Sequence, residues 1–181
     1  MIYDKRVRYG ILGIFIVLAN LICQEILGQL NQPPQTELWQ VKRVVNGQVL
    51  ELQLANDPGS KVERVALAGV NSPLADQKPW GDLAKQYLSD LVANKQLRVK
   101  FEPNAQDLSG RPLVLVWADG LLVNRSLIEG GFVLAQTTDA NLSFRSEFEA
   151  AQIRARVLGL GVWDLAQPLR RMPKGNRRRV A

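Results

Sequence analysis

Hydrophobic and polar residues alternate along much of the chain after residue 37, and the period of this pattern changes part-way. From Val49 to Leu54 every second residue is a leucine, and polar side chains occupy most of the intervening positions, which predicts a half-buried strand. Runs rich in apolar residues predict four more strands, at residues 38–45, 62–70, 97–101 and 112–117. Asn46-Gly47 is a strong signal for a tight hairpin between the first two strands.

The pattern takes a helical period between Pro79 and Asn94. Apolar residues recur there at spacings of one, four and five, which predicts an amphipathic helix packing one face on the sheet. A short helix is expected at residues 124–129, ended by Gly130-Gly131, and a final helix at residues 143–158. Five strands with a helix after the third predict an α+β fold, mainly β, with about three helices. The element order fits a five-stranded Greek-key OB-type barrel or an open sheet.

The N-terminal region has a different composition. Lys5, Arg6 and Arg8 precede an apolar run from Gly10 to Cys23, which is typical of a secretory signal or a signal anchor. The run has 14 residues, short against the ~20 that cross a bilayer. The pattern favours a retained anchor, with residues 9–23 contacting the membrane. Removal of a signal peptide near Ala19 remains the alternative.

Charges around the apolar run predict its orientation. Cations precede it, and Glu25 and Glu37 follow it, so the N-terminus is expected in the cytoplasm and the domain outside it, in a periplasmic or lumenal compartment. Cleavage would make the protein secreted. We therefore divide the chain into an N-terminal signal or membrane anchor (1–30), a proline-containing linker (31–37), a folded domain (38–165) and a basic tail (166–181).

Composition excludes several kinds of site. The 181-residue chain has no histidine and one cysteine, so histidine-based catalysis, an internal disulfide and a multi-cysteine metal site are excluded. The net charge is +6, and the tail carries six cations without an acid. Such a tail binds nucleic acid or anionic lipid without reading sequence, or remains solvated. Its cations are Arg170, Arg171, Lys174, Arg177, Arg178 and Arg179.

Several short motifs occur in one order along the domain. The segment from Val65 to Leu74 reads VALAGVNSPL, and Asp107 to Arg111 reads DLSGR. The others are VVNGQV at 44–49, WGDLAKQYL at 80–88, DGLLVN at 119–124, LIEGGF at 127–132 and ARVLGLGVW at 155–163. Together they resemble the staphylococcal-nuclease-like (thermonuclease) family from about Leu38 to Trp163. The resemblance implies the OB-type barrel rather than the open sheet.

The resemblance also implies where the family's chemistry would lie. Members join a Ca²⁺ ion, carboxylate ligands, a glutamate base and two arginines, which together neutralise a phosphodiester and activate water. Here the two ligand positions hold Gln48 and Asn71, and the base position holds Leu74. One arginine position is Ala66, whereas the other is retained as Arg111. The family site is therefore expected to be degenerate, and no catalytic or metal-binding residue is assigned.

Two charged residues lie near these positions in the sequence. Arg64 precedes Ala66 by two residues on the expected strand, and Asp76 follows Leu74 in the same loop, but they do not restore both a metal cage and a base. Members of the family stack nucleotide rings on tyrosines where this chain has Thr137 and Asp139.

These observations predict a membrane-tethered thermonuclease-fold module without catalytic activity, a pseudoenzyme that contacts an unidentified protein partner. An accessory subunit of a membrane complex would fit this description, and no cofactor is expected. One alternative is a Ca²⁺-dependent endonuclease that hydrolyses phosphodiester bonds with a rearranged site. Another is binding of nucleic acid or anionic lipid through the basic tail.

Overall fold

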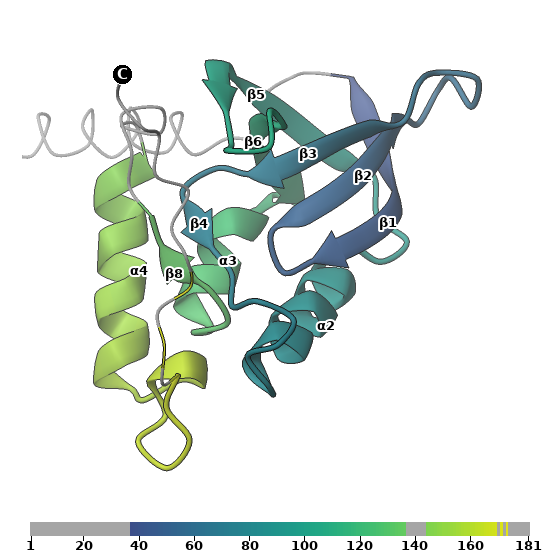
Figure 1. The fold of residues 1–181 in the computed structure, drawn as a ribbon. Helices are drawn as coiled ribbons and strands as arrows, with labels where there is room; N and C mark the ends of the chain where they lie inside the picture. The colour runs from purple at the N-terminus through teal and green to yellow at the C-terminus, as the bar shows by residue number, and fades with distance from the viewer. Residues whose placement is uncertain (1–36, 137–143, 170, 172, 174–181) are drawn as a thin grey trace, which may run out of the picture. The chain divides into compact units, whose positions relative to one another are not determined.

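A computed structural model describes residues 37–136, 144–169, 171 and 173 (Figure 1). The chain divides into two units, Met1–Gln32 and Pro33–Ala181, and all the described residues belong to the second. Its strands are β1 (Leu38–Asn46), β2 (Val49–Leu54), β3 (Glu63–Leu67), β4 (Val70–Asn71), β5 (Leu97–Gln106), β6 (Pro112–Ala118), β7 (Leu121–Leu122) and β8 (Leu134–Ala135). Its helices are α2 (Trp80–Val92), α3 (Val123–Glu129), α4 (Arg145–Val157) and the 3-10 turn η2 (Gly161–Trp163).

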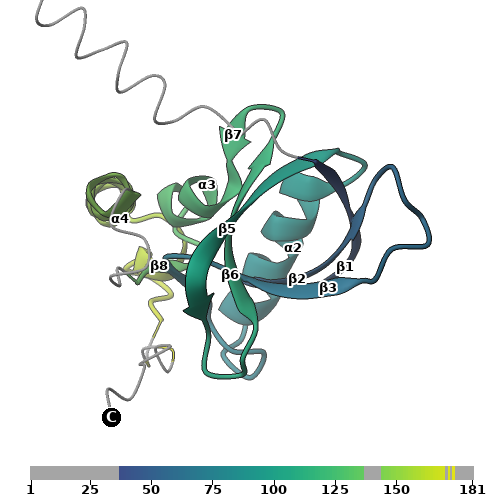
Figure 2. The ribbon, with the colours of Figure 1, turned by 90° about the horizontal axis from the view of Figure 1, so that it is seen from above.

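Five strands form a closed ring. β1, β2 and β3 are successive antiparallel neighbours, β5 pairs with both β1 and β6, and the parallel pair of β3 with β6 closes the ring. The closing pairs are Ala66 with Leu113 and Leu67 with Val114. Figure 2 shows these strands curving around one space, with α2 against the ring. The predicted α+β fold with a five-stranded OB-type barrel and three helices is confirmed for the described residues.

The barrel interior and the helix contacts form one apolar core. Alternate residues of the strands point inward, and the inner face of α2 contributes Ala84, Leu88 and Val92. Phe148 of α4 is fully buried in the same core. Burial of one face thus explains the strand and helix periods in the sequence. The large side chains buried without exposure include Leu50, Leu52, Leu97, Leu115, Leu127 and Ile128.

Two strand predictions differ from the structure. The run at residues 62–70 is not one strand, because the chain turns at Ala68-Gly69, where Gly69 has a φ of 73°, and β4 then pairs with β8 instead of continuing β3. The strand predicted at residues 97–101 extends to Gln106, past Pro103. The pairing with β6 is irregular between Phe101 and Gln106, so the missing N–H of proline interrupts no regular ladder.

A second, smaller apolar cluster lies on the α2 and β8 side of the domain. Trp80, Leu134 and Val162 are its buried members, and Trp163 and Leu169 pack against it. The backbone of η2 approaches the end of α3 closely, because a Cβ on Gly161 would lie 2.2 Å from the carbonyl oxygen of Gly131. This cluster holds the chain after α4 against the barrel.

The predicted N-terminal signal or membrane anchor, and the predicted linker up to residue 36, lie outside the described residues. Within the described ranges, no helix is both long enough and apolar enough to cross a membrane.

Candidate active site

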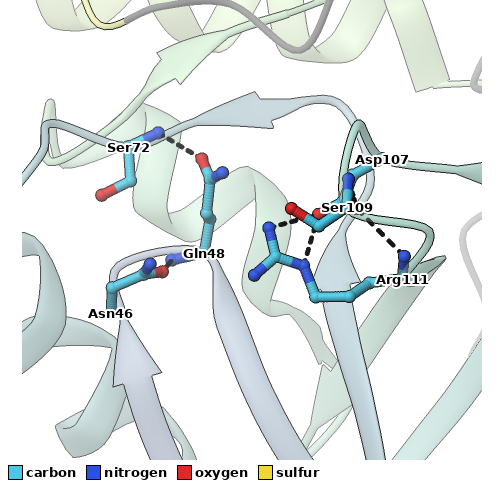
Figure 3. A network of polar contacts seen from close by, with 6 residues as sticks. All are labelled: Asn46, Gln48, Ser72, Asp107, Ser109 and Arg111. Carbon is cyan, nitrogen blue, oxygen red and sulfur yellow. Dashed lines mark hydrogen bonds and ion pairs between the residues drawn. The ribbon is translucent and has the colours of Figure 1, made fainter.

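The turn between β1 and β2 carries the first predicted ligand position. Gln48 donates its backbone N–H to Oδ1 of Asn46 at 3.0 Å, and its side-chain Oε1 accepts the backbone N–H of Ser72 at 2.6 Å (Figure 3). The turn packs tightly, because a Cβ on Gly47 would lie 2.3 Å from Oγ of Ser72. Gln48 therefore ties the β1–β2 turn to the segment that follows β4.

The second ligand position and the base position lie on that following segment. Asn71, at the end of β4, donates from Nδ2 to the carbonyl oxygen of Pro173 at 3.3 Å. Leu74 is 43% exposed, and its backbone N–H donates to Oε1 of Gln77 at 2.8 Å. Position 74 thus presents an apolar side chain to solvent, and position 71 contacts the C-terminal part of the chain.

The position of the missing arginine lies inside the barrel wall. Ala66 is 1% exposed and pairs with Val49 on one side and Leu113 on the other. The backbone N–H of the next residue, Leu67, donates to the carbonyl oxygen of Gln48 at 2.8 Å. The fold therefore brings positions 48 and 66 close to the start of β6. Arg111 directly precedes that strand.

Arg64 is already engaged by a carboxylate. Its Nε lies 3.8 Å from Oε1 of Glu51, which also accepts two hydrogen bonds from Arg43, at 2.9 and 2.7 Å. The hydrogen bond from Arg43 holds the pKa of Glu51 below its ordinary range, against the opposing effect of burial. Arg64 is thus placed on the outer face of β2 and β3 as the partner of a charged glutamate.

Arg111, the retained arginine, belongs to a closed turn. Its Nε donates to Oδ2 of Asp107 at 2.5 Å, and its backbone N–H donates to Oδ1 at 3.0 Å (Figure 3). Oδ1 also accepts the backbone N–H of Ser109 at 2.8 Å, and the carboxylate of Asp107 is fully buried. The Arg111 side chain is 25% exposed, so it keeps some access to solvent while it neutralises Asp107.

Oxygen donors around these positions are mostly neutral. The described residues contain no group of three or more acidic or cysteine side chains placed to hold a metal ion. Asp76, the nearby carboxylate considered from the sequence, lies 3.3 Å from Nη2 of Arg171. The side chains at positions 48 and 71 offer amide oxygens, and that of Gln48 already accepts a hydrogen bond.

Comparison with known proteins identifies the fold family. The family model described as "Staphylococcal nuclease homologue" matches residues 64–165, more than half of the chain. The chain belongs to the staphylococcal nuclease family. It is 27% identical over 170 residues to a protein named thermonuclease from Staphylococcus intermedius, covering 88% of this chain and 99% of that relative. A thermonuclease from Staphylococcus hyicus is 23% identical over 166 residues, covering 84% and 96% of the two chains.

Some of the predicted site residues lie outside the described ranges. These are the stacking positions Thr137 and Asp139 and the tail cations Arg170, Lys174, Arg177, Arg178 and Arg179. The sequence did not indicate a role for Gln77. Its Oε1 accepts the backbone N–H of Leu74, and its Nε2 donates to the carbonyl oxygen of Arg171 at 2.5 Å. Its partner lies 94 residues away, and no local motif marks such a contact.

Proposed function

We propose that this protein is a non-catalytic member of the staphylococcal nuclease family whose domain serves in protein interaction. The observation that carries the proposal is the chemistry at four positions. Gln48 and Asn71 stand where the family has anionic metal ligands, Ala66 where it has an arginine, and Leu74 where it has the base. A leucine accepts no proton, and a buried alanine supplies no charge to a phosphate.

The donor set does not fit Ca²⁺. Hard cations of this kind take several oxygen ligands, and carboxylates supply most of the affinity. Gln48 and Asn71 are neutral carboxamides and bring no negative charge to a cation. The oxygen of Gln48 already accepts the backbone N–H of Ser72, and the Asn71 amide donates to the carbonyl oxygen of Pro173. Losing a general base costs about 10²–10⁴-fold in rate, and losing charge stabilisation by a metal costs several kcal/mol more. Together these losses bring hydrolysis close to background.

The sequence supports a membrane tether for this module. The cationic residues before the apolar run at residues 10–23 favour an N-terminus in the cytoplasm and a domain in the periplasm or lumen. Protease accessibility in right-side-out membrane vesicles tests this orientation. Digestion of the domain before lysis is the expected result, and protection until lysis would contradict it.

DNA cleavage tests the absence of catalysis. We expect the purified protein to leave DNA intact with calcium and with chelator. A variant carrying Gln48→Asp, Ala66→Arg, Asn71→Asp and Leu74→Glu is expected to cut with calcium, and to gain thermal stability on calcium addition that the wild type lacks. Calcium-dependent cleavage by the wild type would overturn the proposal.

A weakly active endonuclease is the second candidate, favoured by the retained Arg111 and by the thermonuclease names of both relatives. It requires that the partly exposed side chain of Arg111 contact the phosphate. Under this alternative the wild type cleaves DNA and Arg111→Ala abolishes the cleavage. Binding through the basic tail is separable from both, because it would fall steeply with salt and disappear on truncation after Leu169.

A further inference from the structure

The chain after η2 runs back across the segment that joins β4 to α2. Leu169 packs against the cluster of Trp80, Leu134 and Val162. Nε1 of Trp80 donates to the carbonyl oxygen of Gln167 at 3.1 Å, which fixes the start of the crossing.

Polar contacts continue the crossing toward β4. Nε2 of Gln77 donates to the carbonyl oxygen of Arg171 at 2.5 Å, and Nδ2 of Asn71 donates to that of Pro173 at 3.3 Å. Asp76 lies 3.3 Å from the guanidinium of Arg171, and Pro173 is buried. The contacts at 169, 171 and 173 recur every second residue, which is the period of an extended chain.

In this arrangement, different contacts supply the affinity and the sequence specificity for an extended peptide. The two side-chain amides bind main-chain carbonyl oxygens, which every residue has, so these two contacts add affinity without selecting a side chain. The apolar cluster selects an aliphatic side chain, and Asp76 selects a cation two residues later. Position 71, where the family has a metal ligand, here holds a peptide carbonyl oxygen instead.

We propose that the surface formed by Asn71, Asp76, Gln77, Trp80 and Leu134 recognises an extended peptide of the pattern Leu-x-Arg. The protein's own Leu169, Arg171 and Pro173 occupy this surface, and a segment of a partner protein with the same pattern replaces them. This inference rests on the proposed interaction function, because it names the surface that the module uses.

Intramolecular occupancy lowers the affinity for a partner. A tethered segment competes at an effective concentration on the order of millimolar, and the apparent dissociation constant rises by the inverse of the fraction of open molecules. Weakening the chain's own segment should therefore strengthen binding of a free peptide, whereas weakening the receiving surface should reduce it. These opposite signs distinguish recognition from general loss of structure.

The test uses the full chain and a fluorescein-labelled peptide with the sequence of residues 167–175, followed by fluorescence anisotropy. Two variants weaken the contact of the protein's own segment with the surface and leave the surface itself unchanged. One is the single variant Arg171→Ala, and the other is the double variant Leu169→Ala with Arg171→Ala. We expect the double variant to bind the peptide about tenfold more tightly than the wild type. Adding Gln77→Ala to it should reverse most of this gain, and a peptide with glutamate in place of Arg171 should bind weakly to every variant.

Near-UV circular dichroism shows whether each variant is folded. If the double variant is unfolded, the single variant Arg171→Ala, which keeps the apolar contact of Leu169, provides the test. Equal peptide affinity in the wild type and the folded variants, or no binding by any of them, would overturn the inference. Light scattering tests whether two copies of the chain exchange this segment. Exchange would appear as a concentration-dependent dimer that excess peptide dissociates. DNA cleavage by the wild type would overturn the proposed lack of catalysis and leave the peptide result standing.

Discussion

The side-chain oxygen of Gln48 accepts the backbone N–H of Ser72 at 2.6 Å, which joins the β1–β2 turn to the residues after β4. Ser72 is 4% exposed, so its N–H has little access to water. The position at which the resemblance implies a metal ligand thus contributes to the stability of this fold through an uncharged amide.

Replacing Gln48 with alanine should therefore lower the free energy of unfolding. The loss removes the acceptor of a buried N–H, which costs about 1–3 kcal/mol. Gln48→Glu keeps an oxygen at the same reach and should cost less. Urea denaturation of the two variants measures the difference, and equal losses would mean that the hydrogen bond to Ser72 is not the cause.

A second prediction concerns Asn124, which is fully buried at the start of α3. Its Nδ2 donates to the carbonyl oxygens of Ala68 and Val114 at 2.9 and 3.1 Å, and its Oδ1 accepts the N–H of Val116 at 3.0 Å. Asn124→Ala leaves all three backbone groups without these partners, so we expect a loss of about 3 kcal/mol or more.

The matched control for Asn124 is Asn56, which lies exposed in the turn after β2. Asn56→Ala is expected to change the free energy of unfolding by less than about 0.5 kcal/mol. Chemical denaturation of both variants makes the comparison. Similar small effects at the two positions would show that the hydrogen bonds of Asn124 add little to stability.

Gly131 and Gly161 provide a third prediction, because their backbones touch. A Cβ on Gly131 would lie 2.2 Å from the carbonyl oxygen of Leu160, and both glycines have positive φ, at 71° and 56°. Gly131→Ala should therefore destabilise the protein far more than Gly120→Ala. Gly120 shares a positive φ of 80° but has no heavy atom within 4 Å of its Cβ position. Thermal unfolding separates the steric contribution from backbone strain, and equal shifts in Tm would remove the steric argument.

The pH dependence of stability should differ in sign at two glutamates. Arg43 lowers the pKa of Glu51, so the folded state favours the carboxylate; this stability is present above the ordinary glutamate pKa and is lost as pH falls through the lowered value. Burial raises the pKa of Glu102, so the folded state favours its protonated form and its ionisation is destabilising at neutral pH.

Thermal unfolding of Glu51→Gln and Glu102→Gln between about pH 2 and pH 7 checks these signs. Glu51→Gln should lower Tm at neutral pH and approach the wild type in acid. Glu102→Gln should raise Tm at neutral pH and lose this advantage in acid. Parallel curves for the wild type and both variants would contradict the assignment.

The sequence predicted those elements whose one face is buried. The alternation at Val49 to Leu54 and the helical period at residues 79–94 follow directly from burial against a common core. It did not predict the break at Gly69, because residues on both sides of that turn are apolar and the pattern continues through it.

The candidate site residues could not be predicted from hydrophobic periodicity. The ligand, arginine and base positions came from motifs that resemble the family, since Gln48 and Leu74 carry no chemical signal of their own. The contact of Gln77 with Arg171 joins residues 94 positions apart, and the geometry of the fold alone creates it. Local pattern contains no information about such a pair.

The parallel pairing of β3 with β6 has a consequence for how the domain is made. β1, β2 and β3 can form as a local meander during synthesis, but β3 keeps one unpaired edge until residues 112–118 have been added. Ring closure must therefore await most of the domain, and non-local pairings of this kind slow folding. Until then the growing chain exposes a strand edge that can pair with another chain. Rapid pairing of β6 with β3 after synthesis therefore protects the protein from aggregation.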